Sequence, residues 1–127
     1  MRTWFLGALL LLWMSWAAAA PIQITDIAGR TVTLAQPAQR FVISEGRYVL
    51  TLSLLRPDNP VQGLVGMMQP VSWTYPDLEA QLHAKFPAAK DIALFGHQDQ
   101  SSVSVEKIID LKPEVAIFGV HDHGPGT

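Results

Sequence analysis

The sequence predicts an α/β fold in which a parallel sheet has helices on its faces, preceded by a β-hairpin. Short apolar runs without alternation recur along the chain, as in strands covered on both faces. Helical segments separate these runs, and strand and helix alternating in series favour a three-layer arrangement around parallel strands. Two β-rich runs that flank a glycine turn come before the first unit and predict the hairpin.

The first 19 residues have the three parts of a secretory signal peptide. Arg2 gives a positive start, residues 4–16 are apolar, and small alanines follow. The alternative is a transmembrane anchor, but the apolar run is shorter than the ~20 residues that cross a bilayer, and no charged stop-transfer flank follows it. We expect cleavage after Ala19, because a cut one residue later would place Pro21 beside the scissile bond.

Residues 20–127 form the expected single domain. Loss of Arg2 leaves 8 basic and 11 acidic residues, a net charge of −3, which gives no electrostatic reason to expect nucleic-acid binding or attraction to an anionic membrane. We expect no stable membrane insertion after cleavage. The chain has no cysteine, so its core alone must hold it together, and it lacks the usual lipid-attachment residue of a bacterial lipoprotein. An exported, unanchored domain without disulfides favours the periplasm of a Gram-negative bacterium.

The hairpin is expected over Ile22–Leu34, with its turn at Ala28–Gly29. The first strand of the sheet is expected over Phe41–Ser44, where four residues run without polar alternation. A helix over Tyr48–Leu55 follows and ends before Pro57, which cannot continue it.

The second unit repeats this plan. We expect a strand over Val61–Met67 and then a helix that starts at Pro76 and runs to about Phe86, with acidic residues in its first turn, where the helix dipole favours them. A short strand or extended turn is expected over Asp91–Gly96, and a polar loop over 96–102 follows it.

The third unit contains a short helix. Its apolar face lies at positions i, i+3 and i+4: Val105, Ile108 and Ile109. Ser102 or Ser104 can cap its first turn, and Pro113 ends it and is expected to push Lys112 toward extended geometry. The continuous apolar run Val115–Phe118 then predicts a buried strand.

In open α/β sheets, ligands bind outside the carboxyl ends of the strands, which directs attention to the loops after the four expected strands. A guanidinium there can grip a carboxylate or catecholate oxygen, and aromatic rings can stack on a flat or apolar ligand. The candidate ligand-binding residues are Arg47, Tyr48, Met67, Trp73, His97 and His121. Alternatively, Arg47 is a solvated residue at a helix start and Trp73 fills the core.

His121 and His123 form a separate pattern, because residues at i and i+2 of an extended chain project to one side and suit a metal. No third and fourth ligand is evident close by, so a solvent-exposed polar loop is the alternative. The sequence has no nucleophile elbow, phosphate-binding glycine pattern or paired-carboxylate spacing, and we expect a binding protein without a cofactor and not an enzyme. A metal-dependent hydrolase using His121 and His123 is the rival hypothesis.

Three stretches, "TDIAGRTVTL", "QRFVIS" and "SVEKIIDLKPEVAIF", resemble in their order and spacing the N-terminal lobe of bacterial periplasmic substrate-binding proteins for ferric siderophores, haem and cobalamin. The similarity runs from about Ile24 to Ile117. It implies one lobe of a rigid two-lobed protein that serves an ABC importer. The expected ligand is therefore a ferric siderophore or a haem- or cobalamin-like chelate, the expected partner is an inner-membrane ABC permease, and we expect a monomer.

The resemblance also implies a role for Glu106, which matches the family's helix-opening glutamate that docks onto arginines of the permease. The chain departs from the family at "LLRPDNP", where Leu-Gly is usual, and at Glu114, where Asp is usual. The family has a connecting helix and a second lobe, whereas this sequence stops at "HDHGPGT", so we expect a fragment or a truncated gene product. A periplasmic adaptor that contacts only a protein partner is a further alternative.

Overall fold

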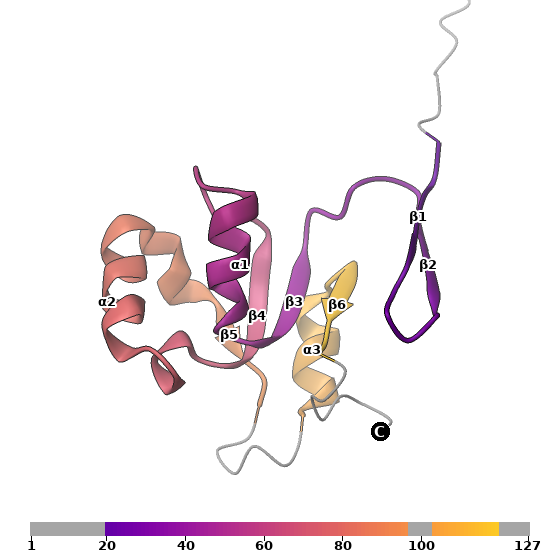
Figure 1. Ribbon diagram of the computed structural model, residues 1–127. Coiled ribbons are helices and arrows are strands. Elements are labelled where there is room, and N and C mark those ends of the chain that lie inside the picture. Colours follow the sequence, from indigo (N-terminus) through magenta and orange to yellow (C-terminus); the bar gives the residue numbers. More distant parts are fainter. Residues whose placement is uncertain (1–19, 97–102, 120–127) are drawn as a thin grey trace, which may run out of the picture.

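A computed structural model describes residues 20–96 and 103–119 of the chain (Figure 1). Within these residues the strands are β1 (Ile22–Thr25), β2 (Thr31–Leu34), β3 (Phe41–Glu45), β4 (Leu64–Gln69), β5 (Ala93–Leu94) and β6 (Val115–Ile117). The helices are α1 (Tyr48–Leu55), α2 (Pro76–Lys85) and α3 (Val105–Leu111), and η1 (Val71–Trp73) and η2 (Pro87–Asp91) are short 3₁₀ segments.

Four strands form a parallel sheet in the order β5-β4-β3-β6, and β1 and β2 form a separate antiparallel hairpin. The predicted α/β class, with a hairpin before a parallel sheet, is therefore confirmed. The chain enters the sheet at β3, builds outward to β5, and then crosses back to place β6 on the other side of β3.

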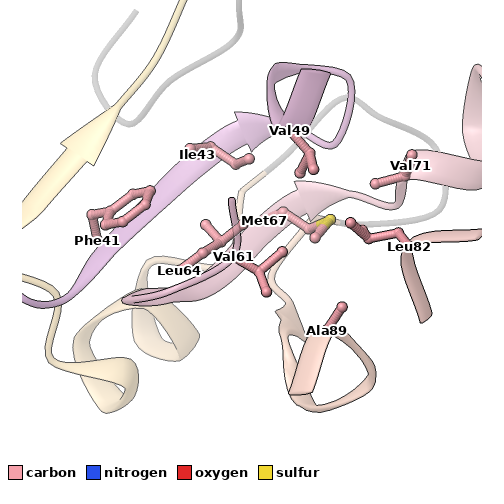
Figure 2. Close-up of a cluster of buried hydrophobic side chains, with 9 residues drawn as sticks. All are labelled: Phe41, Ile43, Val49, Val61, Leu64, Met67, Val71, Leu82 and Ala89. Atoms are coloured by element: carbon pink, nitrogen blue, oxygen red, sulfur yellow. The ribbon is translucent and has the colours of Figure 1, made fainter. Parts of the chain in front are cut away.

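Buried side chains on both faces of the sheet make the structure three-layered. Between the sheet and helices α1 and α2 lies the larger cluster (Figure 2), formed by Phe41, Ile43, Val49, Val61, Leu64, Met67, Val71, Leu82 and Ala89. On the opposite face Val42, Met68 and Phe95 are buried, and Ile108 and Leu111 of α3 pack against them. Successive residues of a strand point to opposite faces of the sheet. Because both faces are covered, successive residues must both be apolar, which explains the continuous apolar runs.

The hairpin turn is built around Asp26. Its Oδ1 accepts the N–H groups of Ala28 and Arg30, and the Arg30 guanidinium donates to Oδ2 at 2.7 Å. Gly29 has φ +79°, a left-handed conformation that favours glycine, so the predicted turn position is confirmed. The backbone and side chain of Arg30 hold the pKa of the Asp26 carboxyl below its ordinary value.

The strand predicted over Val61–Met67 begins three residues later and ends two residues later, because β4 spans Leu64–Gln69. Val61 belongs instead to a turn, in which the Leu64 N–H donates to its carbonyl. The carbonyl of Gly63 then accepts the N–H of Phe41, which fixes the start of β4 against β3. The end of β4 is set by pairing with β3, where Gln69 lies opposite Glu45.

Two predictions about the last unit need correction. Lys112 is not extended but left-handed, with φ 48° and ψ 53°, because it caps α3 and donates its N–H to the carbonyl of Ile109. The strand predicted as buried over Val115–Phe118 is the half-exposed edge of the described sheet: β6 pairs with β3 alone, and Ala116 is exposed. Of the two predicted capping residues, Ser104 is the N-cap, since its Oγ accepts the Lys107 N–H.

Candidate functional site: the carboxyl edge of the sheet

The four strands of the sheet end at one edge, which is the lower edge in Figure 1. Glu45, the last residue of β3, pairs with Gln69, the last residue of β4. The N–H of Gly96, after β5, donates to the Met68 carbonyl at 3.0 Å. The loops that follow these strands are therefore neighbours, as the predicted parallel topology requires.

Contacts between backbones bring the loops after β3 and β4 together. A Cβ added to Gly46 would lie 2.5 Å from both Pro70 C and Val71 N, so only glycine fits this approach. The loop after β6 meets β3 itself, because the N–H of Gly119 donates to the buried Oγ of Ser44 at 3.4 Å. Strands β3 and β6 are also where the direction of chain connection reverses, which is the position where open α/β sheets bind ligands.

Arg47 stands at this reversal point, in the N-cap position of α1, and its guanidinium is paired with Glu45. Nε donates to Glu45 Oε2, and Nη2 donates to Oε1 at 2.8 Å. The guanidinium carbon also lies 5.9 Å from the centre of the Tyr48 ring, within the range of a cation–π contact. Half of the Arg47 side chain is exposed, so the predicted ligand-binding arginine is accessible but already has an acidic partner.

The two predicted aromatic residues differ in exposure. Tyr48 is half-buried and packs against the larger core cluster, so its ring serves partly as a wall of the core. Trp73, in η1, is 54% exposed, which excludes the alternative that it fills the core. Tyr75, two residues further on, is also exposed and was not predicted as a site residue.

The prediction that Met67 binds a ligand needs correction, because its side chain is only 5% exposed and lies in the larger core cluster (Figure 2). The prediction placed it at the last residue of a strand, beside the following loop, but β4 continues past it, and it pairs with Ile43 of β3 and Leu94 of β5. A residue paired on both sides in mid-strand, with its side chain under α1 and α2, is not available to a ligand at the strand ends.

The three histidine candidates, His97, His121 and His123, lie outside the described residues. Across residues 20–96 and 103–119, His, Asp and Glu side chains nowhere gather in a group of three that could hold a metal. The histidine metal site therefore stays a prediction.

Glu106 lies in the first turn of α3 and is exposed, as docking onto a partner would require. Its Oε2 lies 3.4 Å from the Oγ of Ser104, the N-cap residue, so the carboxylate also contributes to the helix end. The start of α3 is held beside β5, because the Ser104 N–H donates to the Phe95 carbonyl at 2.9 Å.

Sequence reasoning missed two acids with structural roles. Glu45 forms an ion pair with Arg47. The sequence signal that could have predicted this pair is an acid two residues before an arginine at a strand end. Glu114 Oε2 accepts the N–H groups of Gln39 and Arg40 at the opposite edge of the sheet, and these two bonds hold the pKa of Glu114 below its ordinary value.

Comparisons with known proteins assign no family, since neither a protein-family model nor a curated protein matches the chain. In the part of the chain that the structure describes, no helix combines the length and apolar character needed to cross a membrane.

Proposed function

We propose that residues 20–127 form a ligand-binding lobe of the substrate-binding component of an ABC importer. In this proposal the protein captures an iron–siderophore complex, or a related metal chelate such as haem or cobalamin, in the periplasm of a Gram-negative bacterium. The observation that carries the proposal is the convergence of four parallel strand ends on one edge, with Arg47 and the exposed Trp73 in the loops there. The sequence resemblance described above gives this edge its ligand class.

Capture on this edge would use two kinds of contact. The exposed Trp73 ring offers an apolar face on which a bulky chelate can stack, and the Arg47 guanidinium offers N–H donors to the oxygen atoms that surround the metal. A second lobe, as the resemblance implies, would cover the outer side of the chelate. One lobe leaves that side in water, so we expect weaker binding by the lobe than by a two-lobed protein.

Fluorescence of Trp73 tests the proposal. A chain that begins at Ala20 has Trp73 as its sole tryptophan, because the other three lie at positions 4, 13 and 16. We expect saturable quenching of its emission by a ferric siderophore, haem or cobalamin in a panel titrated to about 1 mM, which detects binding free energies as weak as about −4 kcal/mol. N-acetyltryptophanamide titrated in parallel corrects for light absorbed by the chelate.

Arg47 provides the site-specific variant. We expect Arg47→Ala to weaken the quenching, whereas Arg30→Ala, which removes another exposed arginine from an ion pair in the hairpin, should leave it unchanged. Absence of saturable quenching by every chelate, or equal effects of the two substitutions, contradicts the proposal.

Delivery to the permease is assigned to Glu106. Reversing its charge with Glu106→Lys is expected to leave the binding of an uncharged chelate unchanged. The same substitution should reduce growth on that chelate when iron is limiting, in the bacterium that produces the protein, because permease arginines would meet a cation. Asp77→Lys is the matched control, since Asp77 is an exposed acid in the first turn of α2 on the other face of the sheet. Equal growth of the Glu106→Lys and parent strains would refute this assignment.

A further inference from the structure

The pairing of Arg47 with Glu45 changes the charge that this edge presents to a ligand. Two guanidinium N–H groups donate to the two carboxylate oxygens, and the carboxylate is the more buried partner, with 19% of its side chain exposed against 50% for arginine. Such a bidentate pair is held in a fixed geometry and carries no net charge. An approaching anion therefore meets a neutral pair in place of an isolated cation.

The other described charges at this edge are mostly acidic. The first turn of α2 contributes Asp77 and Glu79, and the first turn of α3 contributes Glu106. Among the described residues of this edge, Lys107 contributes a positive charge beside these acids, and its Nζ lies 3.4 Å from the Leu94 carbonyl oxygen. With the Glu45–Arg47 pair neutral, the described part of the edge has a negative balance, which repels an anionic ligand.

Neutral oxygen atoms face no such penalty. Arginine has five N–H donors, and the pair with Glu45 uses two of them, so donors remain for uncharged acceptor oxygens. The Tyr48 ring at 5.9 Å from the guanidinium and the exposed Trp73 ring favour a ligand with an apolar or cationic surface.

We infer that Glu45 is a specificity-determining residue that selects a metal chelate of zero or positive net charge, such as a ferric trihydroxamate, over a trianionic ferric tris-catecholate. This inference rests on the proposed function, because it specifies the ligand class of the same edge. A trianionic chelate must lie beside the Glu45 carboxylate or displace it from Arg47, and either event costs binding free energy. A neutral chelate binds without disturbing the pair.

The test compares two probes on three chains that begin at Ala20. Trp73 quenching is titrated with an uncharged ferric trihydroxamate and with a trianionic ferric tris-catecholate, at low and at high salt. Glu45→Gln removes the carboxylate charge, and Asp110→Asn removes the same charge from an exposed position near the far end of α3. Melting temperatures of all three chains establish that each is folded.

We expect the parent chain to bind the trihydroxamate at least about tenfold more tightly than the tris-catecholate, and Glu45→Gln to reduce that ratio by about tenfold, mainly by tightening the anionic probe. Asp110→Asn should keep the parent ratio, and high salt should reduce the ratio in the parent. Equal or tighter binding of the tris-catecholate, or a ratio that persists in Glu45→Gln, overturns the inference and leaves the proposed function standing. Failure of both probes and of the wider chelate panel overturns the proposed function as well.

Discussion

Replacing Gly46 with alanine tests the contact between the loops after β3 and β4, on which the candidate site depends. The new methyl group would lie 2.5 Å from Pro70 C, 2.5 Å from Val71 N and 2.8 Å from Gln69 O. Ordinary carbon contacts are about 3.5–4.0 Å. All three atoms belong to the backbone, so the strain cannot be relieved by turning a side chain, and the loop after β4 must shift.

The magnitude follows from two opposing effects. Overpacking of this kind costs about 1–3 kcal/mol, and replacing glycine returns about 0.4–1 kcal/mol by restricting the unfolded chain. The net loss should be about 1–2 kcal/mol, which lowers the melting temperature by roughly 4–16 °C in a domain of this size. Because η1 follows Pro70 directly, the emission maximum of Trp73 should shift as well.

Circular dichroism melting and Trp73 emission, measured on the chain that begins at Ala20, provide the assay. Gly29→Ala is the control, since its methyl group meets nothing within 4 Å and its cost arises only from φ +79° in the hairpin. That variant should leave Trp73 emission unchanged. A Gly46→Ala chain with the parent melting temperature and the parent emission would refute the contact between the loops.

Three further predictions follow from the fold. Phe95→Ala empties a fully buried site between the sheet and α3 and should lower the free energy of unfolding in urea by about 3–5 kcal/mol. The control Ile27→Ala, at a residue that is 90% exposed, should change this free energy by less than about 0.5 kcal/mol. Similar losses in the two variants would place Phe95 outside the core. The pKa of Glu114 is lowered in the folded state, so its stabilisation is full above the ordinary pKa and is lost as the pH falls through the lowered value. Glu114→Gln should therefore melt at a lower temperature at neutral pH and lose less stability on acidification, and parallel melting curves of the two chains against pH would contradict this. Export from a Gram-negative host should yield a mass corresponding to cleavage after Ala19, and a periplasmic product that retains residues 1–19 would refute the signal-peptide assignment.

Local sequence patterns predicted most of the elements well. Helix α1 has the predicted bounds, Tyr48–Leu55, because it lies between a glycine turn and Pro57, and both signals are local. The first strand of the sheet, β3, continues one residue beyond its predicted end, to Glu45. The hairpin turn was recognised from Gly29, whose left-handed conformation is a property of the residue itself.

The errors arose where distant residues decide the outcome. The position of Met67 depends on the pairing of β4 with β3 and β5, which no local pattern encodes. A proline after Lys112 disfavours the right-handed helical region but leaves both extended and left-handed conformations open, and the cap on α3 decides between them. The edge position of β6 is likewise a matter of strand order and not of composition.

The candidate site was only partly predictable for the same reason. The rule that ligands bind at strand ends identified Arg47 and the exposed Trp73, because it requires only the order of elements. The ion pair between Glu45 and Arg47 was not predicted, because it depends on side-chain geometry at a strand end. The pairing of charges at this edge therefore depends on the structure, although each residue that contributes to it is visible in the sequence.

A crystal structure of the chain that begins at Ala20, soaked or grown with a ferric chelate, tests the central claim most directly through the anomalous signal of the iron. The account predicts one iron site outside the carboxyl ends of β3 and β4, with the chelate against Trp73 and Arg47. Iron bound at the amino edge of the sheet, on the hairpin, or directly by side chains of the chain without a chelate would contradict it.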